Sequence, residues 1–262
     1  MNITPTALAN RLLNTVANDT THELQTVIHN DLNFRRNSVN LLIGRRGSGK
    51  TYNVFREMIK LNYVPNHGYS QLIYVTNKLS DDTFHKMKKL MSIDIVKVTY
   101  DDVQECLTKI TEAKEDYAEI ITKQLANHLD DEYASSLLET LSINDFKTPV
   151  IHTAVLFDDA IEVFKNRKSV LYRMLFENRQ PKITYFLCIQ DPIGIDASIK
   201  SNIDSAWLFG GFSSQKFSYI FNQLNSPYDR EIVFERYREL TKNQALMFDY
   251  CKDGTKIKII SE

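Results

Sequence analysis

The residues from Gly44 to Thr51 have the types and the spacing of a phosphate-binding loop. They read Gly-Arg-Arg-Gly-Ser-Gly-Lys-Thr and fit the Walker A pattern G-x-x-x-x-G-K-[ST]. Glycines let backbone N–H groups approach phosphate oxygens, and the N-terminus of a following helix adds partial positive charge. We expect Lys50 to reach the β- and γ-phosphates and the Thr51 hydroxyl to bind Mg²⁺. The candidate nucleotide-binding residues are therefore Gly44, Arg45, Arg46, Gly47, Ser48, Gly49, Lys50 and Thr51. Arg45 and Arg46 occupy variable positions, so they are either solvent-facing or extra cations beside the phosphates.

Two acidic residues far downstream can complete such a site. Residues 153–157 read as a buried strand that ends in Asp158 and Asp159, a Walker B pattern. We expect this strand to pair beside the strand that precedes the loop, because carboxyl ends of neighbouring parallel strands open at one crevice. In that arrangement Asp158 holds Mg²⁺ through water, and Asp159 polarises the attacking water.

A further strand, residues 183–189, ends in Gln190. An amide at this position, beside the Asp158-Asp159 strand, can hydrogen-bond the γ-phosphate or the attacking water. The preceding segment is basic, with one acid, Glu177, and these basic residues: Lys165, Arg167, Lys168, Arg173, Arg179 and Lys182. Most of the segment is typical of a solvated helix face. Arg179 differs because it comes immediately before the strand.

The elements that must position these residues follow from hydrophobic periodicity. Short apolar runs predict strands at 41–43, 71–76, 93–98, 153–157, 183–189 and 206–209. Helical spacing is found at 51–59, 84–91, 217–224 and in a last helix whose first turn starts at Pro227, while 195–203 reads as a connection. Residues 245–250 and 255–260 predict a β-hairpin. The alternation predicts an α/β fold of three layers around a central, mostly parallel sheet.

We expect a helical N-terminal lead-in over residues 1–37 and a P-loop ATPase domain over 38–262. Within that domain, 101–147 reads as an acidic helical insertion and 245–260 as the hairpin. Residues 101–150 hold twelve Asp or Glu against four Lys or Arg, so we do not expect a phosphate backbone to lie there.

The composition suits one large domain with its own core: 262 residues, 43% hydrophobic and 25% charged. A net charge of −1 means that any nucleic-acid contact must come from local patches. We find no signal-peptide pattern and no long apolar run, so we expect a soluble protein that is neither secreted nor membrane-spanning. The cysteines and histidines lack metal-binding spacing. Asn77-Lys78 begins like a guanine-binding motif, but Ser80 replaces its aspartate, which argues against a GTPase.

Four of these segments together resemble the FtsK/HerA class of P-loop ATPases. They are Gly44–Thr51, Leu156-Phe157-Asp158-Asp159, Asn178-Arg179 before the strand ending at Gln190, and Lys200-Ser201-Asn202-Ile203 before another strand. The compact chain and the Phe-Asp-Asp form are similar to the poxvirus-type genome-packaging ATPases of large DNA viruses. The resemblance spans roughly residues 38–212. The class usually has Asp-Glu where this chain has Asp158-Asp159.

The resemblance implies a ring, a hexamer, with ATP and Mg²⁺ at subunit interfaces and double-stranded DNA in the pore. Arg179 would be an arginine finger supplied by a neighbour, with Arg167 and Arg173 as alternatives, and Gln190 would sense the nucleotide. The implied function is ATP-driven packaging of a viral DNA genome. Its partners would be viral capsid or portal-vertex proteins, in the viral factory of the host cytoplasm and in the virion.

Three other functions compete with this one. A helicase or clamp loader usually adds a helical lid, whereas this chain is expected to end in a hairpin. A nucleotide-switched capsid-assembly protein does not need a water-activating carboxylate such as Asp159. A small-molecule kinase needs an acceptor-binding motif, and we find none.

Overall fold

The computed structural model describes residues 34, 36–62, 69, 71–78, 82–91, 93–112, 114, 152–159, 161–164, 169–179, 181–192, 195–224, 226–250 and 256–260. The expected lead-in lies outside these residues except for positions 34, 36 and 37. The expected acidic insertion is described only at 101–112 and 114, where 103–112 are helical.

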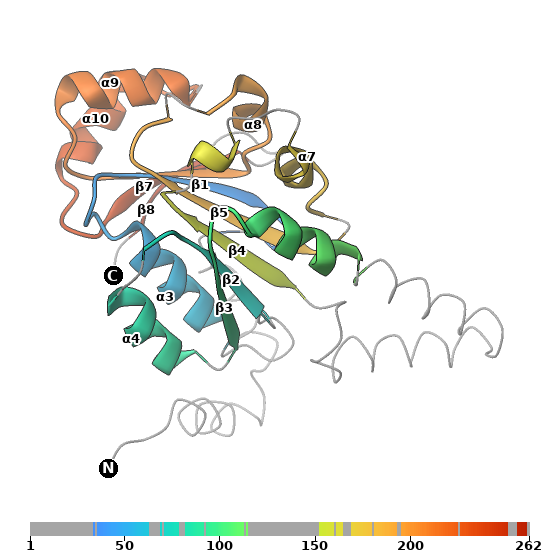
Figure 1. The fold of residues 1–262 in the computed structure, drawn as a ribbon. Helices are drawn as coiled ribbons and strands as arrows, with labels where there is room; N and C mark the ends of the chain where they lie inside the picture. Colours follow the sequence, from blue (N-terminus) through green and yellow to red (C-terminus); the bar gives the residue numbers. More distant parts are fainter. Residues whose placement is uncertain are drawn as a thin grey trace, which may run out of the picture.

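The described strands form one eight-stranded sheet in the order β3-β2-β4-β5-β1-β6-β7-β8 (Figure 1). The first six are parallel: β1 (Val39–Ile43), β2 (Gln71–Val75), β3 (Asp94–Val98), β4 (Thr153–Asp158), β5 (Ile183–Ile189) and β6 (Ser205–Phe209). β7 (Ala245–Asp249) is antiparallel to β6, and β8 (Lys256–Ile260) is antiparallel to β7. The mostly parallel sheet and the C-terminal hairpin are as predicted.

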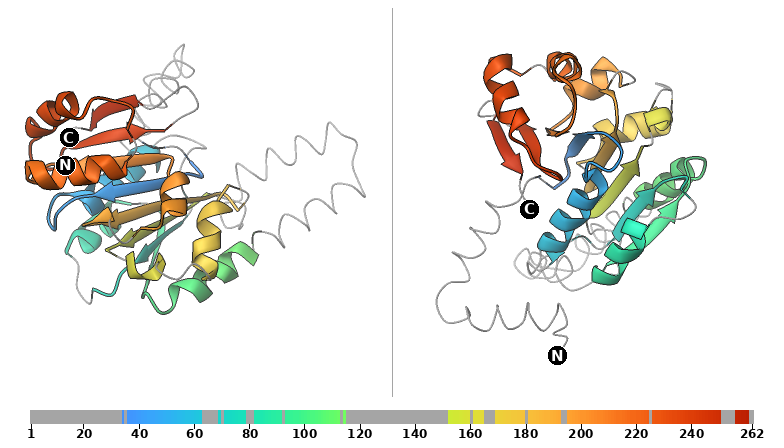
Figure 2. Two further views of the ribbon diagram at one scale, coloured as in Figure 1. Left: turned by 90° about the horizontal axis from the view of Figure 1, so that it is seen from above. Right: turned by 90° about the vertical axis from the view of Figure 1, so that its left-hand side faces the viewer.

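Helices cover both faces of the sheet, which gives three layers (Figures 1 and 2). One face packs against α3 (Lys50–Asn62) and α4 (Asp82–Leu90). The other packs against the helical residues 103–112 and against η1 (Ile161–Phe164), α7 (Val170–Phe176), α8 (Ala197–Ser201), α9 (Ser214–Gln223) and α10 (Arg230–Arg238). Among the described residues, no helix is long and apolar enough to cross a membrane.

The central strands are buried on both faces, which is why they read as continuous apolar runs. Every residue of β1, β4 and β5 is buried. Successive side chains of a strand enter opposite cores: Leu41 and Ile43 pack on the α9 side, whereas Leu42 packs on the α3 side. The buried central strands therefore fix the positions of the residues that follow them at the carboxyl edge of the sheet.

The structure corrects the predicted pairing of the Asp158-Asp159 strand. β4 pairs with β2 and β5, and β1 pairs with β5 and β6, so β5 lies between β4 and β1. All seven residues of β5 are buried and none is charged, which suits a strand with a neighbour on each edge.

Two helix predictions are also corrected. The connection expected at 195–203 contains α8, whose N-cap Asp196 accepts a hydrogen bond from the Ser198 N–H. The last helix begins at Arg230 and not at Pro227, because the Asp229 carboxylate caps it by accepting from the backbone N–H groups of Glu231 and Ile232 at 2.8 and 3.1 Å.

Candidate functional site

A cavity of about 450 Å³ lies at the carboxyl edge of the sheet, beside the N-terminus of α3. It is lined by Arg46, Gly47, Ser48, Gly49, Lys50, Thr51, Tyr52, Lys78, Asp158, Asp159, Gln190, Lys242 and Asn243. Carboxyl edges of parallel sheets are where ligands bind in α/β folds. Residues 46–51 of the loop, both aspartates and the glutamine predicted from the sequence therefore meet in one place, whereas Gly44 and Arg45 are not among the lining residues.

The loop between β1 and α3 depends on two glycines with positive φ. Gly47 has φ 76° and Gly49 has φ 94°, values that side-chain-bearing residues rarely adopt. A Cβ on Gly49 would lie 2.6 Å from Asn243 Oδ1, whereas a Cβ on Gly47 would meet no atom within 4 Å. Gly47 thus leaves open space beside its backbone, as close approach of a phosphate requires.

Lys50 is buried within the loop, at 8% exposure. Its ammonium donates to the carbonyl oxygens of Gly44 and Arg45, at 2.6 and 3.0 Å. Burial lowers the pKa of Lys50, and Cys188, Asp158 and Asp159 act in the opposite direction. The loop therefore holds a cation in place by its own carbonyls, close to the open cavity.

The Asp158 carboxylate accepts from three donors, which lie on α3, on β2 and just after β2. Its Oδ1 accepts from Thr51 Oγ1 at 2.9 Å, and its Oδ2 accepts from the Tyr74 hydroxyl at 3.1 Å and forms an ion pair with Lys78. Carboxylate and hydroxyl oxygens side by side are ligands that suit a hard divalent cation such as Mg²⁺. Thr51 and Asp158 therefore fit the metal site predicted for them.

Asp159 turns out of the strand and is fixed by its neighbour. It has φ 63°, a left-handed conformation that aspartate tolerates better than most residues. Its N–H donates to the carbonyl of Cys188 at 2.9 Å, and its Oδ2 accepts from Gln190 Nε2 at 2.6 Å. Both side chains are exposed at the cavity, where a water molecule and a phosphate can reach them.

Several cavity residues were missed by sequence reasoning. Lys78 follows the carboxyl end of β2, the strand next to β4, and a search for polar residues after every strand would have found it. Tyr74, within β2, contacts Asp158 but is buried and does not line the cavity. Lys242 and Asn243 come from the turn between α10 and β7, for which no local motif exists. Tyr52 follows Thr51 on the first turn of α3.

The charges around the cavity favour a polyphosphate. Four cations, Arg46, Lys50, Lys78 and Lys242, line it together with two aspartates. Arg45 points elsewhere: its guanidinium carbon lies 5.7 Å from the centroid of the Phe212 ring.

Arg179 lies at the opposite end of the sheet from the cavity, just before the amino end of β5. Its Nη2 is 3.5 Å from Asp204 Oδ1, and its side chain is 79% exposed. Arg173, on α7, is 3.5 Å from Glu177 and 69% exposed. Arg167 lies outside the described residues. Neither Arg173 nor Arg179 is among the residues that line the chain's own cavity.

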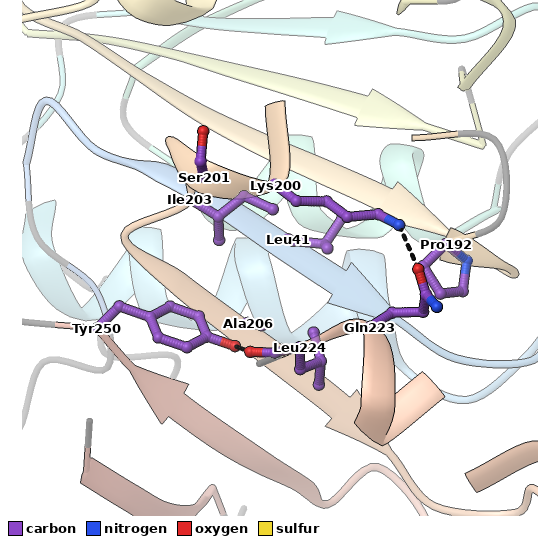
Figure 3. A pocket seen from close by; sticks show the side chains of 9 residues that line it. All are labelled: Leu41, Pro192, Lys200, Ser201, Ile203, Ala206, Gln223, Leu224 and Tyr250. Carbon is purple, nitrogen blue, oxygen red and sulfur yellow. Dashed lines mark hydrogen bonds between the residues drawn. The ribbon is translucent and has the colours of Figure 1, made fainter. Parts of the chain in front are cut away.

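The Lys200–Ile203 motif lines a second, smaller cavity of about 200 Å³ (Figure 3). Leu41 of β1 and Ala206 of β6 also line it. Figure 3 shows the Lys200 ammonium at one end, where it donates to Gln223 Oε1 at 2.7 Å. Lys200 of the motif therefore links α8 to α9 by a hydrogen bond, and no residue of the motif lines the first cavity.

Comparison with known proteins places the fold. No protein-family model matches the sequence, and no curated protein matches it at a significant level. The structure is similar to B204, the DNA-packaging ATPase from Sulfolobus Turreted Icosahedral Virus, with a TM-score of 0.52 and 18% identity over 87% of this chain and 98% of that chain. The chain has the fold of viral packaging ATPases.

Two further solved structures agree with this assignment. The genome-packaging NTPase B204 from Sulfolobus turreted icosahedral virus 2, in complex with AMPPCP, has a TM-score of 0.52 and 18% identity over 86% of this chain and 97% of that chain. EssC (ATPases 2 and 3) from Geobacillus thermodenitrificans has a TM-score of 0.51 and 13% identity over 84% of this chain and 39% of that chain. At the level of the fold, the resemblance seen in the motifs is confirmed.

Proposed function

We propose that this protein is an ATP-hydrolysing, DNA-translocating motor that packages a viral double-stranded DNA genome into a capsid. The observation that carries the proposal is the Asp159–Gln190 pair, which lies in one cavity with the phosphate-binding loop and the Thr51–Asp158 pair. A chain that only binds a nucleotide has no need of a carboxylate held beside the phosphates. The fold shared with packaging ATPases supports the same conclusion.

In the proposed site, the N–H groups of Gly44–Thr51 and the N-terminus of α3 bind the phosphates of ATP. Lys50 exchanges the carbonyls of Gly44 and Arg45 for β- and γ-phosphate oxygens. Thr51 and Asp158 hold Mg²⁺, which when bound neutralises charge on those oxygens.

Asp159 accepts a hydrogen bond from the attacking water and draws its proton away from the oxygen that bonds to phosphorus. Gln190 fixes the orientation of the Asp159 carboxylate through the 2.6 Å hydrogen bond. Because Gln190 is exposed to the same cavity, its amide also senses whether the γ-phosphate is present.

The remaining catalytic cation is supplied by a neighbouring subunit. Arg179 lies before the amino end of β5 and the cavity lies beyond its carboxyl end, and a strand of seven residues spans roughly 23 Å. Arg179 therefore serves the cavity of the next copy in a ring, which we propose is a hexamer. Double-stranded DNA passes through the pore, and capsid or portal-vertex proteins hold the ring at the virion in the host cytoplasm.

The decisive experiment measures ATP hydrolysis with and without double-stranded DNA, together with ring size by native mass spectrometry. We expect feeble hydrolysis by the monomer and stimulation on assembly with DNA. Lys50→Ala should abolish ATP binding, whereas Lys86→Ala, which removes an exposed lysine of α4, should not. DNA affinity should fall steeply with salt, with a slope that counts the phosphates contacted.

Other results would favour the competing functions. Strand separation driven by ATP would indicate a helicase-like ring. Hydrolysis indifferent to DNA, with nucleotide-dependent binding of capsid protein, would indicate an assembly switch. A monomer that hydrolyses ATP as fast as the ring would contradict a shared active site.

A further inference from the structure

Lys78 lies against the carboxylate that is expected to hold magnesium. Its ammonium forms an ion pair with Asp158 Oδ2. The Asp158 side chain is only 6% exposed, whereas that of Lys78 is 46% exposed. A buried carboxylate needs a positive partner, because its charge has lost most of its contact with water. In this structure Asp158 forms an ion pair with Lys78 and also accepts from Thr51 and Tyr74.

The main chain around Lys78 is anchored, and its side chain is long. The Lys78 N–H donates to Thr76 Oγ1 at 3.2 Å, and Lys97 hydrogen-bonds the Lys78 carbonyl. Next to it, Asn77 Oδ1 accepts from the Tyr100 N–H at 2.9 Å. A flexible stem of four carbons therefore carries the ammonium from a fixed origin on the cavity wall.

The same cavity is lined by Lys50, Lys78 and Gln190. With a divalent cation held by Thr51 and Asp158, the charge of Asp158 would be neutralised, and the Lys78 ammonium would be repelled from it. The negative charge that would then attract the Lys78 ammonium is the phosphate chain of the bound nucleotide. The attraction is stronger for a nucleoside triphosphate, because its terminal phosphate carries charge that a diphosphate lacks.

We propose that Lys78 is the counter-ion of Asp158 in the metal-free protein and that its ammonium moves to the terminal phosphate when a Mg²⁺–nucleoside triphosphate binds. This inference rests on the proposed nucleotide site. It makes Lys78 a specificity-determining residue that lets the cavity distinguish triphosphate from diphosphate. It also links occupancy of the cavity to the ends of β2 and β3.

The test is calorimetric titration of Lys78→Met with ADP and with ATPγS over a series of Mg²⁺ concentrations. Without the competing ammonium, the Mg²⁺ concentration that half-saturates ADP binding should fall roughly tenfold, as loss of a charge-assisted hydrogen bond predicts. At saturating Mg²⁺, the preference for ATPγS over ADP should also fall roughly tenfold. Neither the Mg²⁺ midpoint nor the nucleotide preference depends on ATP hydrolysis.

Two further variants separate this role from general stabilisation. Lys109→Met removes an exposed ammonium and its ion pair with Glu105, neither of which lines the cavity, and should change neither value. Lys78→Arg keeps the charge and should retain the ATPγS preference within about threefold. An unchanged preference and an unchanged Mg²⁺ midpoint in Lys78→Met would overturn the proposal.

The outcome is independent of the motor function. If Lys78→Met behaves as expected but DNA neither binds nor stimulates hydrolysis, the packaging proposal fails and the role of Lys78 stands. If DNA stimulates hydrolysis and both binding values are unchanged in Lys78→Met, the role of Lys78 fails and the packaging proposal stands.

Discussion

Gln190 Nε2 donates a hydrogen bond to Asp159 Oδ2 at 2.6 Å, which joins the carboxyl ends of β5 and β4. The two strands are in register with Asp158 opposite Cys188, and the Asp159 N–H reaches the Cys188 carbonyl. The pairing of the two strands therefore sets the position of the carboxylate, and the amide sets its orientation.

Asp159→Asn should bind ATP and fail to hydrolyse it. Asparagine has the same shape and accepts the φ of 63°, so the loop and the Asp158 site stay intact. Loss of a general base lowers the rate by about 10²–10⁴. Steady-state hydrolysis and ATPγS affinity, measured on the same preparation, check this. Full hydrolysis by Asp159→Asn would place the base elsewhere.

Gln190→Ala should lower kcat with little change in nucleotide affinity. Its amide orients the Asp159 carboxylate and contributes no charge to phosphate binding. We therefore expect kcat to fall about 10²-fold. The matched control is Gln215→Ala, which removes an exposed amide from α9 and should leave kcat unchanged. If Gln190→Ala weakens ATPγS binding as strongly as it lowers kcat, the amide serves binding instead.

Arg179→Ala should lower hydrolysis by about 10³–10⁵, as loss of an arginine finger does. Because the finger acts in the neighbouring site, mixing Arg179→Ala with Asp159→Asn should restore activity that neither variant has alone. Random mixing in a closed ring leaves roughly a quarter of the sites with both groups intact. No recovery after mixing would show that Arg179 does not act across an interface, and Arg173→Ala is then the next variant to test.

Gly47→Ala and Gly49→Ala should show how much stability is lost to backbone strain alone and how much to a steric clash in addition. Both positions have positive φ, so each alanine costs about 1–2 kcal/mol of strain. Only Gly49→Ala also pushes on Asn243, since its Cβ would lie 2.6 Å from Asn243 Oδ1. Urea denaturation should therefore rank Gly49→Ala below Gly47→Ala in stability. Equal losses would show that Asn243 moves aside freely.

Local motifs were predicted correctly because their geometry is encoded within a few residues. Gly44–Thr51 fixes a turn and a helix start whatever surrounds it, and the β7–β8 hairpin is likewise a local pairing. The positions of the acidic pair and Gln190 at the carboxyl edge of the sheet were predicted for a related reason: each follows an apolar run, and parallel strands end at one edge. Their roles stay predictions.

Long-range order was harder to predict. Nothing near Asp158 in the sequence reveals that β5 lies between β4 and β1. Lys78 was considered only as part of a guanine motif, since its contact with Asp158 depends on β2 lying next to β4. α10 begins after Asp229 and not at Pro227, because the Asp229 carboxylate accepts hydrogen bonds from two backbone N–H groups of its first turn.

Asn53, on α3, connects the loop of Gly44–Thr51 to the segment that precedes β7. Its Nδ2 donates to the carbonyls of Gly49 and Asn243, at 2.9 and 3.1 Å, and Asn243 lies two residues before β7. Any coupling through this shared donor is reciprocal. If a bound nucleotide stabilises the Asn53 contacts, amide hydrogen exchange in β7 should slow, and separation of β7 from β6 should weaken nucleotide binding by the same free energy.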